Sequence, residues 1–308
     1  MPCVSIQIKK MYAKVQSRSK ALREKLLKCS DYADVEKGEK MKFTKMHGIG
    51  NDYIYFDCTK ENPIEDPNAL SVKLSDRHFG VGGDGIVMIL PSDKADFRMR
   101  MFNADGSEGA MCGNATRCIG KYVFEKGLTD KTELSLETKS GIKYLTLNVE
   151  NGTVKTVAVN MGQPKVGVVS GTLEANNTEY TYTFVDVGNP HCVIFTDTDV
   201  ETLELEKIGP AIENHELFPD RANVEFVNVR DENNLRMRVW ERGSGETWAC
   251  GTGACATTVA AVANGISKKN TAVNVKLNGG TLSIEYKDDT VIMTGEATFV
   301  FEGEVINA

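Results

Sequence analysis

Cys112 and Cys250 are each followed by glycine and each opens a predicted helix. A helix N-terminus carries about half a positive charge and free N–H donors, and it can lower a thiol pKa from about 8.5 to about 3.5–7.5. Two thiols that face one cleft from opposite sides suit inversion at a carbon bearing hydrogen. One thiolate removes the proton from one face, and the other thiol delivers a proton to the opposite face.

An internal repeat relates the two cysteines. When the sequence is shifted by 138 residues, residues 98–102 fall on residues 236–240, and Cys112-Gly113 falls on Cys250-Gly251. No gap is needed between these matches, and agreement at one offset indicates a duplication. We therefore expect two copies of one domain that face each other across a pseudo-twofold axis, with both thiols in the shared cleft.

Short apolar runs and turn residues predict the elements around the cysteines. Strands are expected in most of the chain from residue 43 onward, including three over 132–159 with turns at Ser140-Gly141 and Asn151-Gly152. Helices are expected over residues 68–77, 113–124, 200–214 and 253–264. Residues 80–85 fit G-x-G-x-x-G, but they precede a predicted strand instead of following one, which favours a tight turn over a dinucleotide site.

The chain divides into three parts. Residues 1–40 form a basic extension of unknown role, with ten Lys/Arg against five Asp/Glu and a possible helix over 15–29. We interpret it as an extension upstream of the natural start, with an organelle transit peptide as the alternative. The first domain is expected over 41–160 and the second over 161–308, whose last strands can pair with the first domain.

Composition excludes several classes of function. The 308 residues carry a net charge of −7, which disfavours nucleic-acid binding. The longest apolar runs have five residues, far below the ~20 of a membrane-spanning helix. With no export signal, we expect a cytoplasmic location and reduced thiols. The spacing of the eight cysteines and the scarcity of histidine also argue against a metal site.

Polar residues at turns and strand ends are candidates for ligand contacts. Glu241-Arg242 lies just before Cys250 and is typical of a clamp for a zwitterion, with Arg for the carboxylate and Glu for the ammonium. His191 is placed either to tune a thiol or simply to form a hydrogen bond. Four asparagines sit at comparable positions: Asn51, Asn103, Asn189 and Asn223.

Several motifs resemble those of the diaminopimelate epimerase family over about residues 41–305. The opening segment 43–53 (FTKMHGIGNDY) and the two cysteine motifs, 111–114 (MCGN) and 249–254 (ACGTGA), carry the resemblance most specifically. Residues 188–191 (GNPH) and 221–226 (RANVEF) are similar to the family's second-domain substrate segments.

The resemblance implies an α+β fold in which each domain is a mixed sheet curled around a central helix. It implies a cofactor-independent, usually homodimeric epimerase for L,L- and meso-2,6-diaminopimelate in lysine synthesis, with Cys112 and Cys250 as the acid/base pair. Backbone N–H groups would hold the reacting carboxylate, Glu241 would contact the reacting amino group, and other side chains would bind the distal end. The residues implied are Gly113, Asn114, Gly251 and Thr252 for the carboxylate, and Asn51, Asn103, Asn189, Asn223 and Arg242 for the distal end.

Two alternatives stay open from the sequence. A proline or hydroxyproline racemase shares the fold and the cysteine pair, but that family typically has His where Asn114 stands. A non-catalytic binding protein would not need two opposed thiols. One departure from the diaminopimelate pattern is Gly85, where many members carry a Gln that touches substrate; here that contact is expected to be missing.

Overall fold

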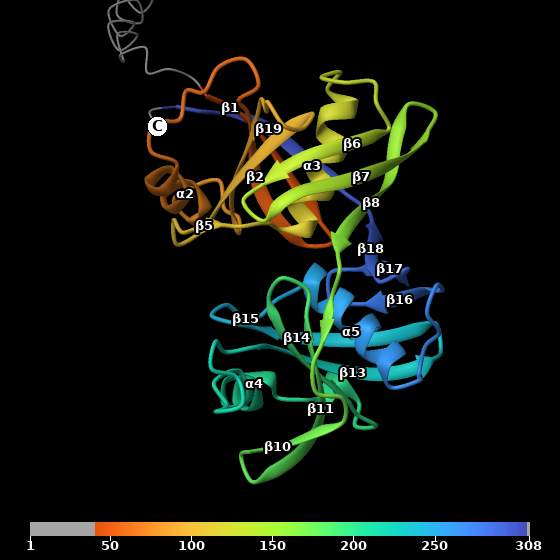
Figure 1. The fold of residues 1–308 in the computed structure, drawn as a ribbon. Helices are drawn as coiled ribbons and strands as arrows, with labels where there is room; N and C mark the ends of the chain where they lie inside the picture. Colours follow the sequence, from red (N-terminus) through yellow and green to blue (C-terminus); the bar gives the residue numbers. More distant parts are fainter. Residues whose placement is uncertain (1–40, 307–308) are drawn as a thin grey trace, which may run out of the picture. The chain divides into compact units, whose positions relative to one another are not determined.

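The first half of the chain alternates strands with two helices (Figure 1). In chain order the elements are β1 (Met41–Gly48), β2 (Asn51–Asp57), α2 (Pro67–Ser75), β3 (Gly85–Leu90), β4 (Phe97–Asn103), β5 (Glu108–Gly109), α3 (Gly113–Glu125), β6 (Glu133–Thr138), β7 (Gly141–Glu150) and β8 (Thr153–Gly162). The three strands expected over 132–159 are confirmed as β6, β7 and β8. Asn151 and Gly152, between β7 and β8, both have positive φ, as a tight hairpin turn requires.

The second half repeats this order after a short lead-in. Its elements are β9 (Lys165–Val166), β10 (Gly171–Ala175), β11 (Thr178–Asp186), β12 (Pro190–Phe195), η2 (Val200–Thr202), α4 (Leu205–Glu213), β13 (Asn223–Asp231), β14 (Asn234–Glu241), β15 (Gly245–Glu246), α5 (Gly251–Ala263), β16 (Ala272–Lys276), β17 (Thr281–Lys287), β18 (Thr290–Gly295) and β19 (Thr298–Val305).

This computed structural model describes residues 41–306, of which Lys42–Gly303 form one compact unit. The predictions for residues 1–40, including the helix over 15–29, lie outside the described residues. Within the described part of the chain, no helix is long and apolar enough to cross a membrane. The division at residue 160 stays a prediction.

The duplication extends to strand pairing. Helices α2 and α4, and likewise α3 and α5, begin and end 138 residues apart. β2 pairs with β3 in parallel and β3 with β4 antiparallel, and β12, β13 and β14 pair in the same way. β4–β6 and β14–β16 are again parallel. The expected α+β fold of two related halves, each a mixed sheet around a central helix, is confirmed.

The two halves are joined through β8 and β18, which pair antiparallel with Val159 opposite Met293. Both central helices contribute to one continuous buried cluster that also contains Met293. Most residues of α3 and α5 are buried, because each helix is surrounded by strands. The starts of the two helices are therefore fixed by one shared core.

Three predicted helices differ from their expected bounds by two residues or more. The helix expected over 68–77 spans Pro67–Ser75. The helix expected over 200–214 is split into η2 and α4, because Asp199 caps the short first turn and the chain leaves helical geometry at Leu203. The helix expected over 253–264 begins two residues earlier, at Gly251, directly after its capping residue Cys250.

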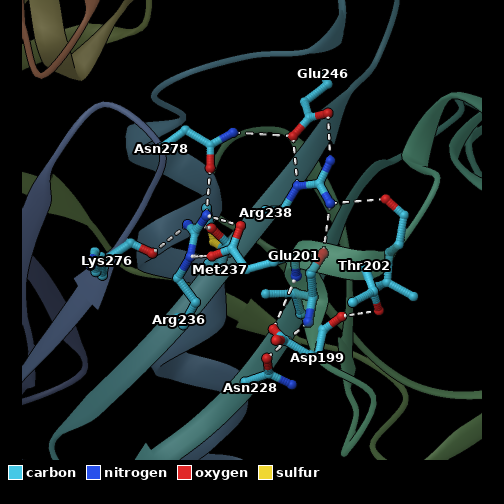
Figure 2. Close-up of polar contacts among 12 residues, drawn as sticks. Asp199, Glu201, Thr202, Asn228, Arg236, Met237, Arg238, Glu246, Lys276 and Asn278 are labelled. Atoms are coloured by element: carbon cyan, nitrogen blue, oxygen red, sulfur yellow. Dashed lines mark hydrogen bonds and ion pairs between the residues drawn. The ribbon is translucent and has the colours of Figure 1, made fainter.

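An ion pair braces the hairpin that leads to each cysteine. Arg100 Nε donates to Glu108 at 2.7 Å, and Arg238 Nε donates to Glu246 at 2.8 Å at the equivalent place in the second half. Figure 2 shows Arg238 with Glu246 and the neighbouring Arg236 with Glu201 and Asn278. Because these charged groups form ion pairs and hydrogen bonds with one another, we assign them the structural role of holding β14 and β15 in place.

Gly85 has a structural role that its sequence position did not reveal. Its φ is +153°, and a Cβ on this backbone would lie 2.0 Å from the carbonyl oxygen of Phe102 on the neighbouring strand. A Gln cannot occupy this backbone. The glycine is therefore needed where the 80–85 turn enters β3, and this turn precedes the strand as predicted. The expected lack of a Gln contact with substrate stays a prediction.

We expect Gly85→Ala to lower the free energy of unfolding by about 3 kcal/mol or more, because it combines an unfavourable φ with a backbone clash. Urea denaturation measures this loss. Gly127→Ala is the matched control, since Gly127 also has positive φ but has open space around it; its loss should be about 1–2 kcal/mol. Equal losses in both variants would show that the Phe102 carbonyl imposes no constraint.

Candidate functional site

Cys112 and Cys250 are the N-caps of the two central helices. Both have extended backbone geometry, and each sulfur accepts a hydrogen bond from a backbone N–H of the first helical turn. The donors are Ala115 N, 3.5 Å from Cys112 Sγ, and Gly253 N, 3.3 Å from Cys250 Sγ. The sequence placed both thiols correctly at helix starts.

The two helix starts meet around Met293. A Cβ on Gly113 would lie 2.5 Å from Met293 Cε, and one on Gly251 would lie 3.0 Å from Met293 Sδ. Asn114 Nδ2 also donates to the carbonyl of Ala249, the residue before Cys250, at 3.2 Å. The glycine after each cysteine thus lies against the flexible end of Met293, where the starts of the two helices come close together.

Glu241, at the end of β14, acts on both thiols. Burial raises the pKa of Cys112, and the Glu241 carboxylate raises it further, while N–H groups of Ala115 and Asn114 partly oppose this. Burial, then Glu241 and Glu225, hold the pKa of Cys250 well above its ordinary value. The expectation that the helix N-termini lower both thiol pKa values is therefore wrong for the free protein, because burial outweighs them.

Glu241 is itself perturbed by its surroundings. Burial raises the pKa of this carboxyl, and Thr247 Oγ1 donates a hydrogen bond to it. A carboxyl beside two buried thiols fits the predicted contact with an ammonium group, since an ammonium would neutralise the local negative charge.

A chain of polar contacts leads from a buried carboxylate to Cys250. His191 is fully buried, with Nδ1 2.7 Å from Glu225 Oε1 and Nε2 3.1 Å from Asn189 Oδ1. Asn189 Nδ2 donates to Thr252 Oγ1 at 3.3 Å, and that hydroxyl lies 3.5 Å from Cys250 Sγ. His191 is therefore hydrogen-bonded in the core, as one of its two suggested roles requires; the other role, tuning of the thiol, stays a prediction.

Asn51 forms a hydrogen bond with the other thiol, that of Cys112. Its Oδ1 accepts a hydrogen bond from Cys112 Sγ at 3.3 Å, while its Nδ2 donates to Asp84 Oδ2 at 2.7 Å. Arg77 ties Asp84 to Asp52 through its Nη2 atom. Asp84 therefore fixes which end of the Asn51 amide faces Cys112.

The remaining candidates lie at the ends of β4, β13 and β14. Asn223 bridges neighbouring segments, since its Nδ2 donates to Pro190 O and its Oδ1 accepts from Arg242 N, both at 2.9 Å. Arg242 is exposed, and its Nη1 donates to Asp220 O at 2.7 Å. Asn103 Nδ2 donates to Ser107 Oγ at 3.0 Å, and no contact between Asn103 and either thiol is seen among the described residues.

Sequence reasoning missed Glu225, Asp84 and Met293. Glu225 is a fully buried acid within the apolar strand β13, and its Oε2 has no hydrogen-bond partner among the described residues. A charged residue inside an apolar run was the available signal. Asp84 and Met293 act by tertiary contact alone, so no local pattern marks them.

The other described cysteines pack in the interior. Cys58, Cys118, Cys192 and Cys255 are buried free thiols. Burial raises the pKa of Cys118 to about 11 and that of Cys255 to about 12. Across residues 41–306, no three His, Cys, Asp or Glu side chains are grouped as a metal site would need.

Comparison with known proteins gives the family context. A family model described as diaminopimelate epimerase matches residues 43–167 and 183–300, one segment in each half. A diaminopimelate epimerase of Agathobacter rectalis is 52% identical over 286 residues, which cover 86% of this chain and 99% of the relative. One of Phocaeicola vulgatus is 55% identical over 278 residues, covering 86% and 98%.

Solved structures share the fold at low identity. A Bacillus anthracis phenazine biosynthesis protein of the PhzF family has a TM-score of 0.67 at 18% identity and covers 87% of this chain and 100% of its own. A hydroxyproline epimerase of Agrobacterium vitis has a TM-score of 0.63 at 14% identity, with 87% and 93% covered. These likenesses support the architecture and carry no information on substrate.

Glu241→Gln should lower the pKa of Cys250, because it removes the nearest carboxylate that disfavours the thiolate. Iodoacetamide labelling of Cys250, followed across pH by peptide mass, should then begin at lower pH than in the unmodified chain. Glu246→Gln is the matched control in the same hairpin, since Glu246 pairs with Arg238. A labelling profile that Glu241→Gln leaves unmoved would contradict the electrostatic role of Glu241.

Proposed function

Because this chain belongs to the diaminopimelate epimerase family, we propose that it interconverts L,L- and meso-2,6-diaminopimelate by two-base proton transfer between Cys112 and Cys250. The observation that carries the proposal is the meeting of two thiol-capped helices around Met293. Lysine biosynthesis is the process that this reaction serves.

The proton transfers balance without any oxidant or cofactor. A thiolate takes the α-proton from one face of the substrate, and the electron pair of the C–H bond stays on carbon as a carbanion. The opposite thiol gives its proton to the other face and becomes the thiolate. Each turnover therefore exchanges the protonation states of the two cysteines, which behave as one coupled pair.

Acid–base transfer supplies only about 10²–10⁴-fold of acceleration, so the carbanion needs further stabilisation. Backbone N–H groups at the two helix starts are suited to hold the reacting carboxylate, with fixed dipoles in a site of low dielectric. Gly113, Asn114, Gly251 and Thr252 provide them. The side-chain amide of Asn114 is already committed to Ala249 and Arg117, so any contact of Asn114 with the carboxylate is assigned to its backbone N–H.

The distal amino-acid end distinguishes diaminopimelate from smaller substrates. We assign its binding to Arg242, which recognises a carboxylate, and to the amides of Asn51, Asn103, Asn189 and Asn223; Glu241 contacts the reacting amino group. Proline and hydroxyproline have no second amino-acid end to occupy such a clamp. Proline and hydroxyproline racemases typically carry His at the position of Asn114. An asparagine there therefore also favours diaminopimelate over proline as the substrate.

Three further predictions stay proposals, and of these the homodimer is the one that the family resemblance implies. We propose a homodimer, a cytoplasmic location, and domains over 41–160 and 161–308. Light scattering on the purified full chain tests the dimer, since a monomer mass at micromolar concentration would contradict it.

Cys112→Ala and Cys250→Ala should each reduce turnover of L,L-diaminopimelate by at least about 10³-fold, because each removes one of the two proton carriers. Chiral chromatography of the products measures the rate, and circular dichroism verifies the fold. Cys118→Ala is the matched control, a buried thiol in the same helix. Near-normal turnover by either active-site variant would refute the two-thiol mechanism.

A further inference from the structure

Arg117 lies one helical turn below Cys112 on α3 and is completely buried. Its hydrogen bonds go to Asn114 Oδ1 at 2.7 Å, Glu296 O at 3.3 Å and Gly113 O at 3.4 Å, and Nη1 lies 3.5 Å from Met293 Sδ. None of these acceptors is a carboxylate. Within residues 41–306, no carboxylate forms an ion pair with this guanidinium.

The surroundings leave room for a guanidinium and little more. A Cβ on Gly48 would lie 2.9 Å from Arg117 Nη2, and one on Gly295 would lie 3.1 Å from Nε. Neither glycine has positive φ. Space for Arg117 accounts for Gly48, whereas a Cβ on Gly295 would first meet Leu282 Cδ2, at 2.5 Å. The packing at the junction between the two halves therefore accommodates the buried guanidinium of Arg117.

A fully buried cation costs several kcal/mol unless a negative charge lies near it. The second half has Cys255 at the position equivalent to Arg117, 138 residues on. The two cysteine sites are therefore unequal: a buried positive charge lies under Cys112, whereas the carboxylates Glu241 and Glu225 act on Cys250.

The ionisable groups around Cys112 determine which of them can supply the negative charge that offsets Arg117. Tyr53 and Tyr55 face it from β2, Cys118 from α3 and Glu241 from β14. Burial holds the pKa values of both tyrosines and of Cys118 far above neutrality, so these groups are uncharged. Glu241 interacts with both thiols and disfavours either thiolate.

We propose that Arg117 is a positioning residue whose buried positive charge stabilises the thiolate of Cys112 and leaves Cys250 as the protonated member of the pair. Through Asn114, the same guanidinium holds the helix start of Cys112 against Ala249, beside Cys250. This inference rests on the proposed thiol pair, and it makes Cys112 the member of the pair that holds the thiolate more readily.

The test is Arg117→Gln in the full chain, with iodoacetamide labelling of Cys112 followed across pH by peptide mass. Labelling at pH 8 should slow by about tenfold, because a rise of one unit in a thiol pKa lowers the thiolate fraction tenfold. The acidic limb of kcat/KM should move to higher pH in parallel, with kcat falling and KM little changed. Arg117→Lys keeps the charge and should slow labelling by less than about threefold.

Lys121→Gln is the matched control, since Lys121 is a buried cation one turn further along α3 with its own partner, Glu125; its Cys112 profile should stay unchanged. A folded Arg117→Gln protein with an unchanged profile overturns the inference. If that variant does not fold, Arg117→Met, an uncharged side chain of similar length, takes its place, and an unmoved Cys112 profile in the folded Arg117→Met protein overturns the inference in the same way. Labelling needs no substrate, so a profile that shifts as expected in a protein without epimerase activity would refute the proposed function alone.

Discussion

The contact of two helix N-termini around Met293 is the constraint on which the site depends. Gly113 and Gly251 both lie against this one side chain, so a Cβ on either glycine would force the flexible end of Met293 to shift. Met293 is fixed in turn by the pairing of β18 with β8, the strands that join the two halves. The duplicated fold thereby directs two equivalent helix starts, each capped by a cysteine, at a single place.

Burial and charge then make the equivalent thiols different. Both lose hydration, and in the free protein this outweighs the helix dipoles and raises both pKa values. Glu241 acts on both thiols. Cys112 also has an amide oxygen and a buried guanidinium nearby, whereas Cys250 has a second carboxylate, Glu225, and a threonine hydroxyl. Such a difference suits a pair in which one member begins as the base and the other as the acid.

Local sequence patterns predicted the parts of the fold that depend on local rules. The two Cys-Gly helix starts, the Asn151-Gly152 turn and the repeat offset were all recognisable. The break near Leu203 was not, because an aspartate cap and a single short turn can belong to a longer helix equally well. The direction of the thiol pKa shifts and the role of Arg117 depend on burial by segments far apart in the chain, which periodicity does not report.

Proton exchange with solvent tests the central claim most directly. The reduced protein is incubated with L,L-diaminopimelate in D₂O, and the α-carbons of substrate and product are followed by mass and by chiral separation at early times. Two opposed thiols predict meso product with one α-deuterium and recovered L,L-substrate that is almost free of deuterium. Equal deuterium labelling of the recovered L,L-substrate and of the meso product would indicate a single base. If neither meso product nor deuterium exchange were found, the result would contradict the proposal that the protein is an epimerase.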